Sequence, residues 1–101
     1  MKIIAPPNIT LPNGIIASFA QFIQNDILSD VQFGRDFEHL QVAYRIHNAV
    51  AQPKLVDSPF TIELTDSDHQ LLKSVMMKPT NGYQPTMAIH LMPFFQAVIN
   101  T

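Results

Sequence analysis

The chain contains no cysteine. Disulfide bonds, thiolate metal sites and a cysteine nucleophile are therefore excluded, because each of them needs a thiol. The absence fits a reducing compartment, and we expect the protein in the cytoplasm. Long apolar runs are missing too: no segment approaches the roughly 18 consecutive apolar residues of a membrane span. The apolar stretch after Lys2 is too short for the core of a signal peptide.

Charged side chains are also scarce. They make up 14% of the residues, whereas about 25% is usual in a globular domain. A single domain over residues 1–101 with 47% hydrophobic residues then has little polar cover, so we expect part of its apolar surface to face a protein partner or a second copy. The alternative is that the many Asn, Gln, Ser and Thr residues supply that cover.

Basic residues are few and dispersed. The six Lys and Arg side chains lie between Lys2 and Lys78 without a run, and the net charge is −2. Nucleic-acid binding depends on clustered basic groups, so the sequence argues against a nucleic-acid ligand and against a transcription-type regulator. The three glycines, Gly14, Gly34 and Gly82, lie too far apart for a glycine-rich phosphate loop, and no serine occupies a G-x-S-x-G elbow.

Apolar residues recur at helical spacing in four segments. The pattern predicts helices at residues 15–28, 36–52 and 66–78, and a last helix that begins near Pro85. Proline suits a first helical position. Pro93 should kink or split the last helix, because it cannot donate to the carbonyl four residues earlier.

Two short segments read as strands. Residues 60–64 alternate apolar and polar side chains, as a half-buried strand does, and residues 2–5 end at two prolines. We expect these segments to pair, because an isolated strand leaves its backbone groups unsatisfied. Residues 9–11 form a further extended piece that ends at a turn over residues 12–14. The sequence thus predicts an α+β fold, mostly helical with about four helices, with a small two-stranded β element.

The third helix carries an N-terminal signature. Thr65 can cap it, while the Asp68 side chain reaches back to the cap amide, as in a capping box with Asp in place of Glu. Pro53 should end the second helix, residues 54–59 should form a linker, and Asp57 should belong to a turn.

The second helix has an unusually wide apolar arc. Its members are Phe37, Leu40, Val42, Ala43, Tyr44, Ile46, Val50 and Ala51. So wide an arc needs cover on two sides, which places the helix either at the centre of the fold or against a partner chain.

Methionine and phenylalanine mark the last third as a second contact surface. Methionine adapts its shape and recurs on adaptable binding surfaces. Met77 points away from the inward arc of its helix, although Met76, Met87 and Met92 could equally fill the core. The interface residues that we predict are Val42, Ile46, Met77, Met87, Phe94 and Phe95.

Polar groups in apolar surroundings are the candidates for chemistry. Asp26 lies at the edge of the first apolar arc, and a hairpin of the first two helices would bring it level with His39, as a salt bridge or as an orienting pair for a general base. His47 falls within the apolar arc of the second helix, either as a neutral core histidine or as a pH-sensitive contact. His39, His47, His69 and His90 lack the i, i+3 or i, i+4 spacing of metal ligands. We expect no catalytic residue, no metal and no cofactor.

One resemblance adds to this pattern. The stretch FTIELTDSDHQLL at residues 60–72, Tyr83-x-Pro85, and LMPFFQAV at residues 91–98 resemble the C-terminal halves of short accessory proteins of tailed bacteriophages. These motifs are structural: a strand, a cap and a helix started by proline. The resemblance implies a phage-encoded assembly or host-interaction protein, placed in the host cytoplasm, and transfers no catalytic residue.

Two functions follow from the sequence. The first is a non-enzymatic interaction protein, such as an assembly subunit, an adaptor or a host-factor inhibitor, that docks through apolar helical surface and forms a homo-oligomer. The alternative is a small ligand-binding or enzymatic domain with a helix-lined pocket that uses Asp26, His39 and His47.

Overall fold

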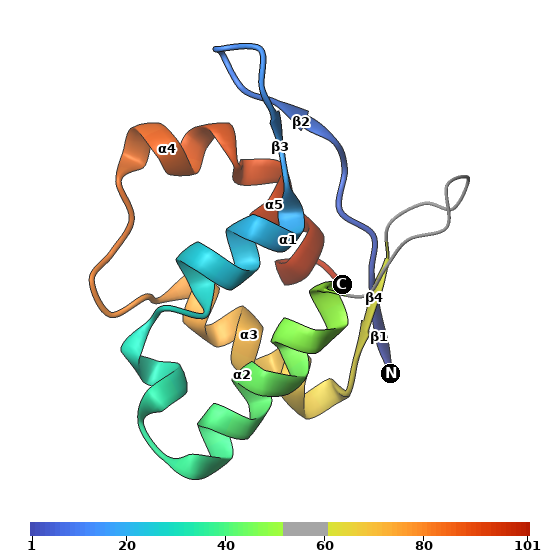
Figure 1. Cartoon of the computed structure of the whole chain (residues 1–101), viewed down its shortest axis with the longest axis vertical. Coiled ribbons are helices and arrows are strands. Elements are labelled where there is room, and N and C mark those ends of the chain that lie inside the picture. Colours follow the sequence, from blue (N-terminus) through green and yellow to red (C-terminus); the bar gives the residue numbers. More distant parts are fainter. Residues whose placement is uncertain (52–60) are drawn as a thin grey trace.

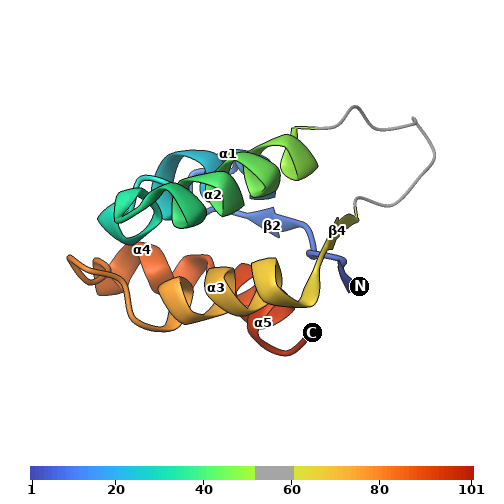
Figure 2. The same ribbon diagram turned by 90° about the horizontal axis from the view of Figure 1, so that it is seen from below.

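Two layers of helices make up most of the fold (Figures 1 and 2). The computed structural model describes residues 1–51 and 61–101, and it confirms the predicted α+β, mostly helical class. The helical elements are α1 (Phe19–Gln21), the π-helical η1 (Phe22–Ile27), the 3-10 helix η2 (Val31–Gly34), α2 (Phe37–Val50), α3 (Asp66–Met77), α4 (Pro85–His90) and α5 (Met92–Ile99). The strands are β1 (Lys2–Ile4), β2 (Ile9–Thr10), β3 (Ile16–Ala17) and β4 (Ile62–Leu64).

The core lies between the two layers. Figure 2 shows α1 and α2 on one side and α3, α4 and α5 on the other. Ile23 and Ile46 from the first layer and Leu72 and Val98 from the second are fully buried. Phe94 of α5 contacts the first layer directly: its ring centroid lies 5.2 Å from that of Phe19 in an edge-to-face pair. The apolar faces of short amphipathic helices thus become the shared interior.

The predicted pairing of the N-terminal segment is confirmed. β1 and β4 form an antiparallel sheet with Lys2 opposite Leu64 and Ile4 opposite Ile62. Alternation along β4 buries Ile62 and Leu64 and exposes the residue between them, as a half-buried strand requires. The strand begins at Ile62 rather than Phe60, which lies outside the described residues.

The prediction that the first helix begins at residue 15 is wrong. A second two-stranded sheet occupies this region: Ile9 pairs with Ala17 and Thr10 pairs with Ile16. Gly14 has a φ of 84°, which a glycine adopts readily, and the chain can therefore reverse there. The helix starts only after Ser18, whose hydroxyl accepts a hydrogen bond from the amide of Gln21 at 3.3 Å.

Capping also sets the limits of α2. Asp36 accepts a hydrogen bond from the amide of His39 at 2.8 Å, and the helix runs from Phe37 to Val50. The end that we predicted at Pro53, the linker over residues 54–59 and the turn at Asp57 lie outside the described residues.

Two further sequence signals have the predicted effect. Thr65 caps α3 by accepting a hydrogen bond from the amide of Asp68 at 3.2 Å. Pro93 separates α4 from α5, which meet at Leu91. The second half of the predicted capping box is wrong. The Asp68 side chain does not reach back to the cap amide, because both of its carboxylate oxygens accept hydrogen bonds from Arg45.

Two adjacent isoleucines in β1 test what this strand contributes. The Ile4 side chain is 0% exposed, whereas that of Ile3 is 56% exposed. Ile4→Ala should lower the free energy of unfolding by about 3 kcal/mol through lost burial and a residual cavity. Ile3→Ala is the matched control, with an expected loss below about 1 kcal/mol. Urea unfolding measures both changes. Equal losses would show that β1 does not seal the core.

Candidate functional site

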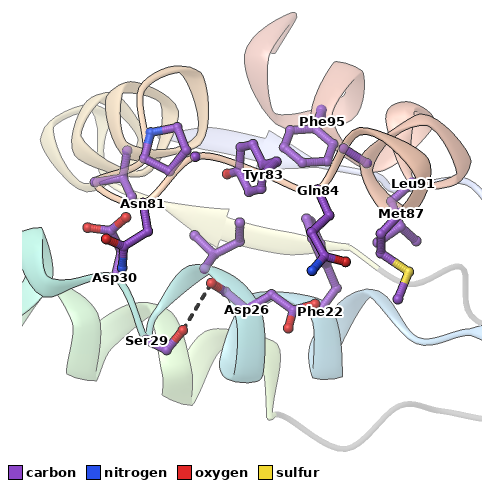
Figure 3. A pocket seen from close by; sticks show the side chains of 15 residues that line it. Phe22, Asp26, Ser29, Asp30, Asn81, Tyr83, Gln84, Met87, Leu91 and Phe95 are labelled. Carbon is purple, nitrogen blue, oxygen red and sulfur yellow. Dashed lines mark hydrogen bonds between the residues drawn. The ribbon is translucent and has the colours of Figure 1, made fainter.

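A pocket of about 380 Å³ opens between the two layers. Residues of η1, with Ser29 and Asp30 after it, form one wall, and the segment from Pro79 to Phe95 forms most of the other (Figure 3). Its lining is partly apolar, with Phe22, Leu91 and Phe95, and partly polar. A concave site of this kind, mostly apolar with a few convergent polar groups, is typical of small-molecule binding sites.

Two carboxylates line the pocket, and they differ in their hydrogen bonding. Asp30 accepts hydrogen bonds from the amide of Gln32 at 2.9 Å and from the amide and hydroxyl of Thr80, both at 2.8 Å. Burial raises the pKa of Asp30, but these hydrogen bonds outweigh it and hold the pKa below its usual value. The Asp26 carboxylate has no partner among the described residues, since the nearby Ser29 hydroxyl donates to the Asp26 backbone carbonyl at 3.1 Å. Asp30 is therefore structural, and Asp26 is available.

Three aromatic rings form the apolar side of the pocket. Phe95 lies between Tyr83 and Phe22, with ring centroids 5.0 Å and 5.3 Å away. The Tyr83 hydroxyl is buried and has no hydrogen-bond partner in the part of the chain that the structure describes. Burial raises the pKa of Tyr83 to about 12, and the charges of Asp30 and Asp26 act in the same direction. The pocket thus holds a neutral phenol that can still donate and accept.

The structure separates the three polar residues that the sequence grouped together. Asp26 lines the pocket, but His39 does not pair with it: His39 Nδ1 lies 2.6 Å from Oδ1 of Asp36. The predicted pair of Asp26 and His39 is therefore wrong, because Asp36 caps α2 and lies one turn before His39. His47 is exposed, and its prediction as a core residue is also wrong. The buried face of α2 runs through Ile46, so the next residue points outward.

The predicted interface residues divide between interior and surface. Ile46, Phe94 and Phe95 belong to the core, and Val42 is half-buried. The prediction of a contact surface at Ile46, Phe94 and Phe95 is corrected, since these side chains already join the two layers of the chain itself. Met77 and Met87 are exposed, as is Met92, whereas Met76 fills the core.

Two buried polar residues of α3 were not predicted. Asp68 forms a two-point ion pair with Arg45 of α2, with nitrogen–oxygen distances of 2.7 Å and 2.8 Å. This hydrogen-bonded contact raises the pKa of Arg45. His69 Nε2 donates to the Val98 carbonyl at 2.7 Å, since a carbonyl only accepts. Both residues lie three or four places before Leu72, so helical spacing alone could have placed them on the buried face.

α2 presents a separate apolar stripe to solvent. Phe37, Leu40 and Tyr44 are 71%, 53% and 70% exposed. The structure therefore divides the wide apolar arc of this helix: one side builds the core, and the other side is not covered by residues 1–51 or 61–101.

Comparison with known protein families, curated proteins and solved structures gives no match to this chain. Within residues 1–51 and 61–101, no group of three or more His, Cys, Asp or Glu residues is placed to hold a metal ion. Over the same ranges, no helix has the length and apolarity needed to cross a membrane.

The buried phenol predicts a pH dependence of stability. The folded protein keeps the Tyr83 proton to a pKa of about 12, whereas the unfolded chain loses it near 10. The free energy of unfolding should therefore fall as the pH rises from about 10 to about 12. Tyr83→Phe should make this fall smaller, as measured by urea unfolding at each pH. Tyr44→Phe removes the same atom from an exposed ring and is the matched control; an equal effect in both variants would contradict the assignment to Tyr83.

The ion pair between the layers predicts an asymmetry. Arg45→Met leaves the buried Asp68 carboxylate without its partner, so it should destabilise clearly, whereas Arg35→Met at an exposed arginine should change the free energy of unfolding by less than about 0.5 kcal/mol. Adding Asp68→Leu to Arg45→Met should recover much of the loss, because it removes the buried charge that Arg45→Met leaves unpaired. Thermal unfolding of the three variants tests this. A double variant no more stable than Arg45→Met would contradict it.

Proposed function

We propose that the protein is a non-enzymatic interaction protein that self-associates through the exposed stripe of α2. The observation that carries this proposal is the exposure of Phe37, Leu40 and Tyr44 along one face of a 14-residue helix. Large apolar side chains gathered on one face mark association sites in soluble proteins. In the sequence this stripe belonged to an arc that needed cover on two sides, and the described residues cover only one of them.

The spacing of the stripe is that of a helix-pairing seam. Positions 37, 40, 44, 47 and 51 alternate steps of three and four residues, which is the pattern of the buried positions in paired helices. Phe37, Leu40 and Tyr44 fill the first three positions, and the exposed His47 and Ala51 fill the other two. A second α2 can lie along the same line.

An antiparallel pair of α2 helices satisfies this seam by two-fold symmetry. With the axis between Leu40 and Tyr44, Leu40 of one copy contacts Tyr44 of the other, and Phe37 contacts His47. The contact is isologous, so both copies use the same patch. The acidic start of the helix, with Asp36 and Glu38, then lies beside the end that carries His47, and the opposed helix dipoles attract each other.

The size of the stripe limits the affinity. A standard interface buries about 800 Å² on each partner. The four side chains that meet in this pairing, those of Phe37, Leu40, Tyr44 and His47, cover less than that. We therefore expect a dimer that dissociates at micromolar concentration. Such a dimer suits an assembly subunit whose contact is completed by further copies.

The biological setting is part of the same proposal. The resemblance of residues 60–98 to accessory proteins of tailed bacteriophages supports a phage-encoded assembly subunit or host-factor inhibitor, which would act in the cytoplasm of the host. The pocket supports the alternative of a ligand-binding domain in part: of Asp26, His39 and His47, only Asp26 lines it.

Sedimentation over a range of concentrations tests the self-association. The native chain should shift from monomer to dimer, and Leu40→Asp should remain monomeric, because a charge in the seam would be buried without a partner. The dissociation constant should rise at least tenfold, which is about 1.4 kcal/mol.

Met77→Asp is the matched control, since Met77 is equally exposed but lies on α3. It should leave the dimer unchanged. A native chain that stays monomeric would overturn the proposed self-association. Dissociation by Met77→Asp with no effect of Leu40→Asp would place the interface on α3 and also overturn the role of α2.

A further inference from the structure

We propose that the pocket between η1 and the Pro79–Phe95 segment binds a small organic cation, an ammonium group carried on an apolar or aromatic body. Three features of this cavity support the proposal. The Asp26 carboxylate and the buried Tyr83 hydroxyl have no partner among the described residues, and aromatic rings form one wall. Its volume of about 380 Å³ falls in the range of roughly 300–1,000 Å³ that is typical of small-molecule sites.

Charge selects a cation. Asp26 and Asp30 line the pocket, and no lysine, arginine or histidine does so among the described residues. Asp30 is held by Thr80 and Gln32 but keeps its charge, whereas Asp26 has free lone pairs. An ammonium group would pair with Asp26 and feel the field of Asp30.

The aromatic wall fits the body of such a ligand. Phe95 packs edge to face on Tyr83 and at a tilt on Phe22, and Leu91 and Met87 extend the apolar surface of the cavity. Aromatic faces also attract a cation through their quadrupoles, which adds to the carboxylates. A neutral apolar molecule would gain only the burial, and an anion would be repelled.

The Tyr83 hydroxyl gives the site a second polar contact. Figure 3 shows it directed away from Phe95, toward the side of the pocket with Asn81 and Asp30. Because a buried hydroxyl without a partner is unfavourable, the phenolic oxygen gains by accepting an N–H from the ammonium group. In the same view, the Gln84 side chain extends from the Pro79–Phe95 wall toward Asp26 on the other wall. Its amide oxygen can accept a further N–H from the ammonium group.

This inference is independent of the proposed self-association. No residue of the α2 stripe lines the pocket, so Leu40→Asp can abolish the dimer and leave ligand binding intact. Failure of one proposal is thereby distinguishable from failure of the other.

Three probes that share a phenyl ring on a short chain and differ in the end group and its charge test the proposal: 2-phenylethylamine, 2-phenylethanol and 3-phenylpropanoate. Each has one phenyl ring and a short chain that ends in a cation, a neutral group or an anion. Titrations of the full chain followed by amide NMR shifts should show the amine binding with a dissociation constant of about a millimolar, as its size allows. The alcohol should bind more weakly, and the carboxylate should not bind. The shifts should centre on Ser29 and Gln84.

Two variants assign the contacts. Asp26→Asn should weaken amine binding about fivefold, because it removes the charge that attracts the ammonium group. The effect is no larger because the Asp26 carboxylate is exposed to solvent. Tyr83→Phe should weaken it about threefold through the lost hydrogen bond. Asp26→Asn should not change the affinity for 2-phenylethanol by more than the error of the titration.

Glu63→Gln is the matched control: it also removes one exposed negative charge, but from β4, outside the pocket. It should leave amine binding unchanged. Equal affinity for the amine and the alcohol, equal effects of Asp26→Asn and Glu63→Gln, shifts that centre outside the pocket, or no binding of the amine would each overturn the proposal.

Discussion

The packing of Phe94 and Phe95 against η1 holds the two helical layers together. Phe94 reaches Phe19 and Phe22, and Phe95 reaches Phe22 and Tyr83. These adjacent side chains point to the core in part because Pro93 starts a new helix just before them. The same contacts fix the spacing between the layers, so the core and the pocket depend on one set of rings. Stability and the shape of the pocket are therefore coupled through α5.

Strong local signals predicted much of the fold. The Thr65 cap and the break at Pro93 each depend on a few neighbouring residues, and both are present. The pairing of β1 with β4 was predicted from a general requirement, that strand backbones must be hydrogen-bonded. The start of the first helix was predicted too early, because the apolar pattern continues through Ile15 and Ile16. The turn at Gly14 and the cap at Ser18 outweigh this pattern, and the helix begins only after Ser18.

The candidate site was harder to predict, because it depends on how helices face one another. A helical wheel shows which residues share a face, but it does not say which face a neighbour covers. The arc of α2 was therefore treated as one surface, and Ile46 and Leu40 were not distinguished. Asp26 was identified as unusual, yet most of the residues that line the pocket with it come from residues 79–95, more than 50 positions away in sequence.

The sheet of β1 and β4 closes the chain on itself between its first residues and residue 64. During synthesis, β1 leaves the ribosome about 60 residues before its partner strand does. During that interval the backbone edge of β1 has no strand to pair with, and Ile4 has no residue opposite it in a sheet. η1 and α2 can already contact each other. The order of translation thus leaves β1 an unpaired strand edge until β4 has emerged, and an unpaired edge is a template for pairing with another chain.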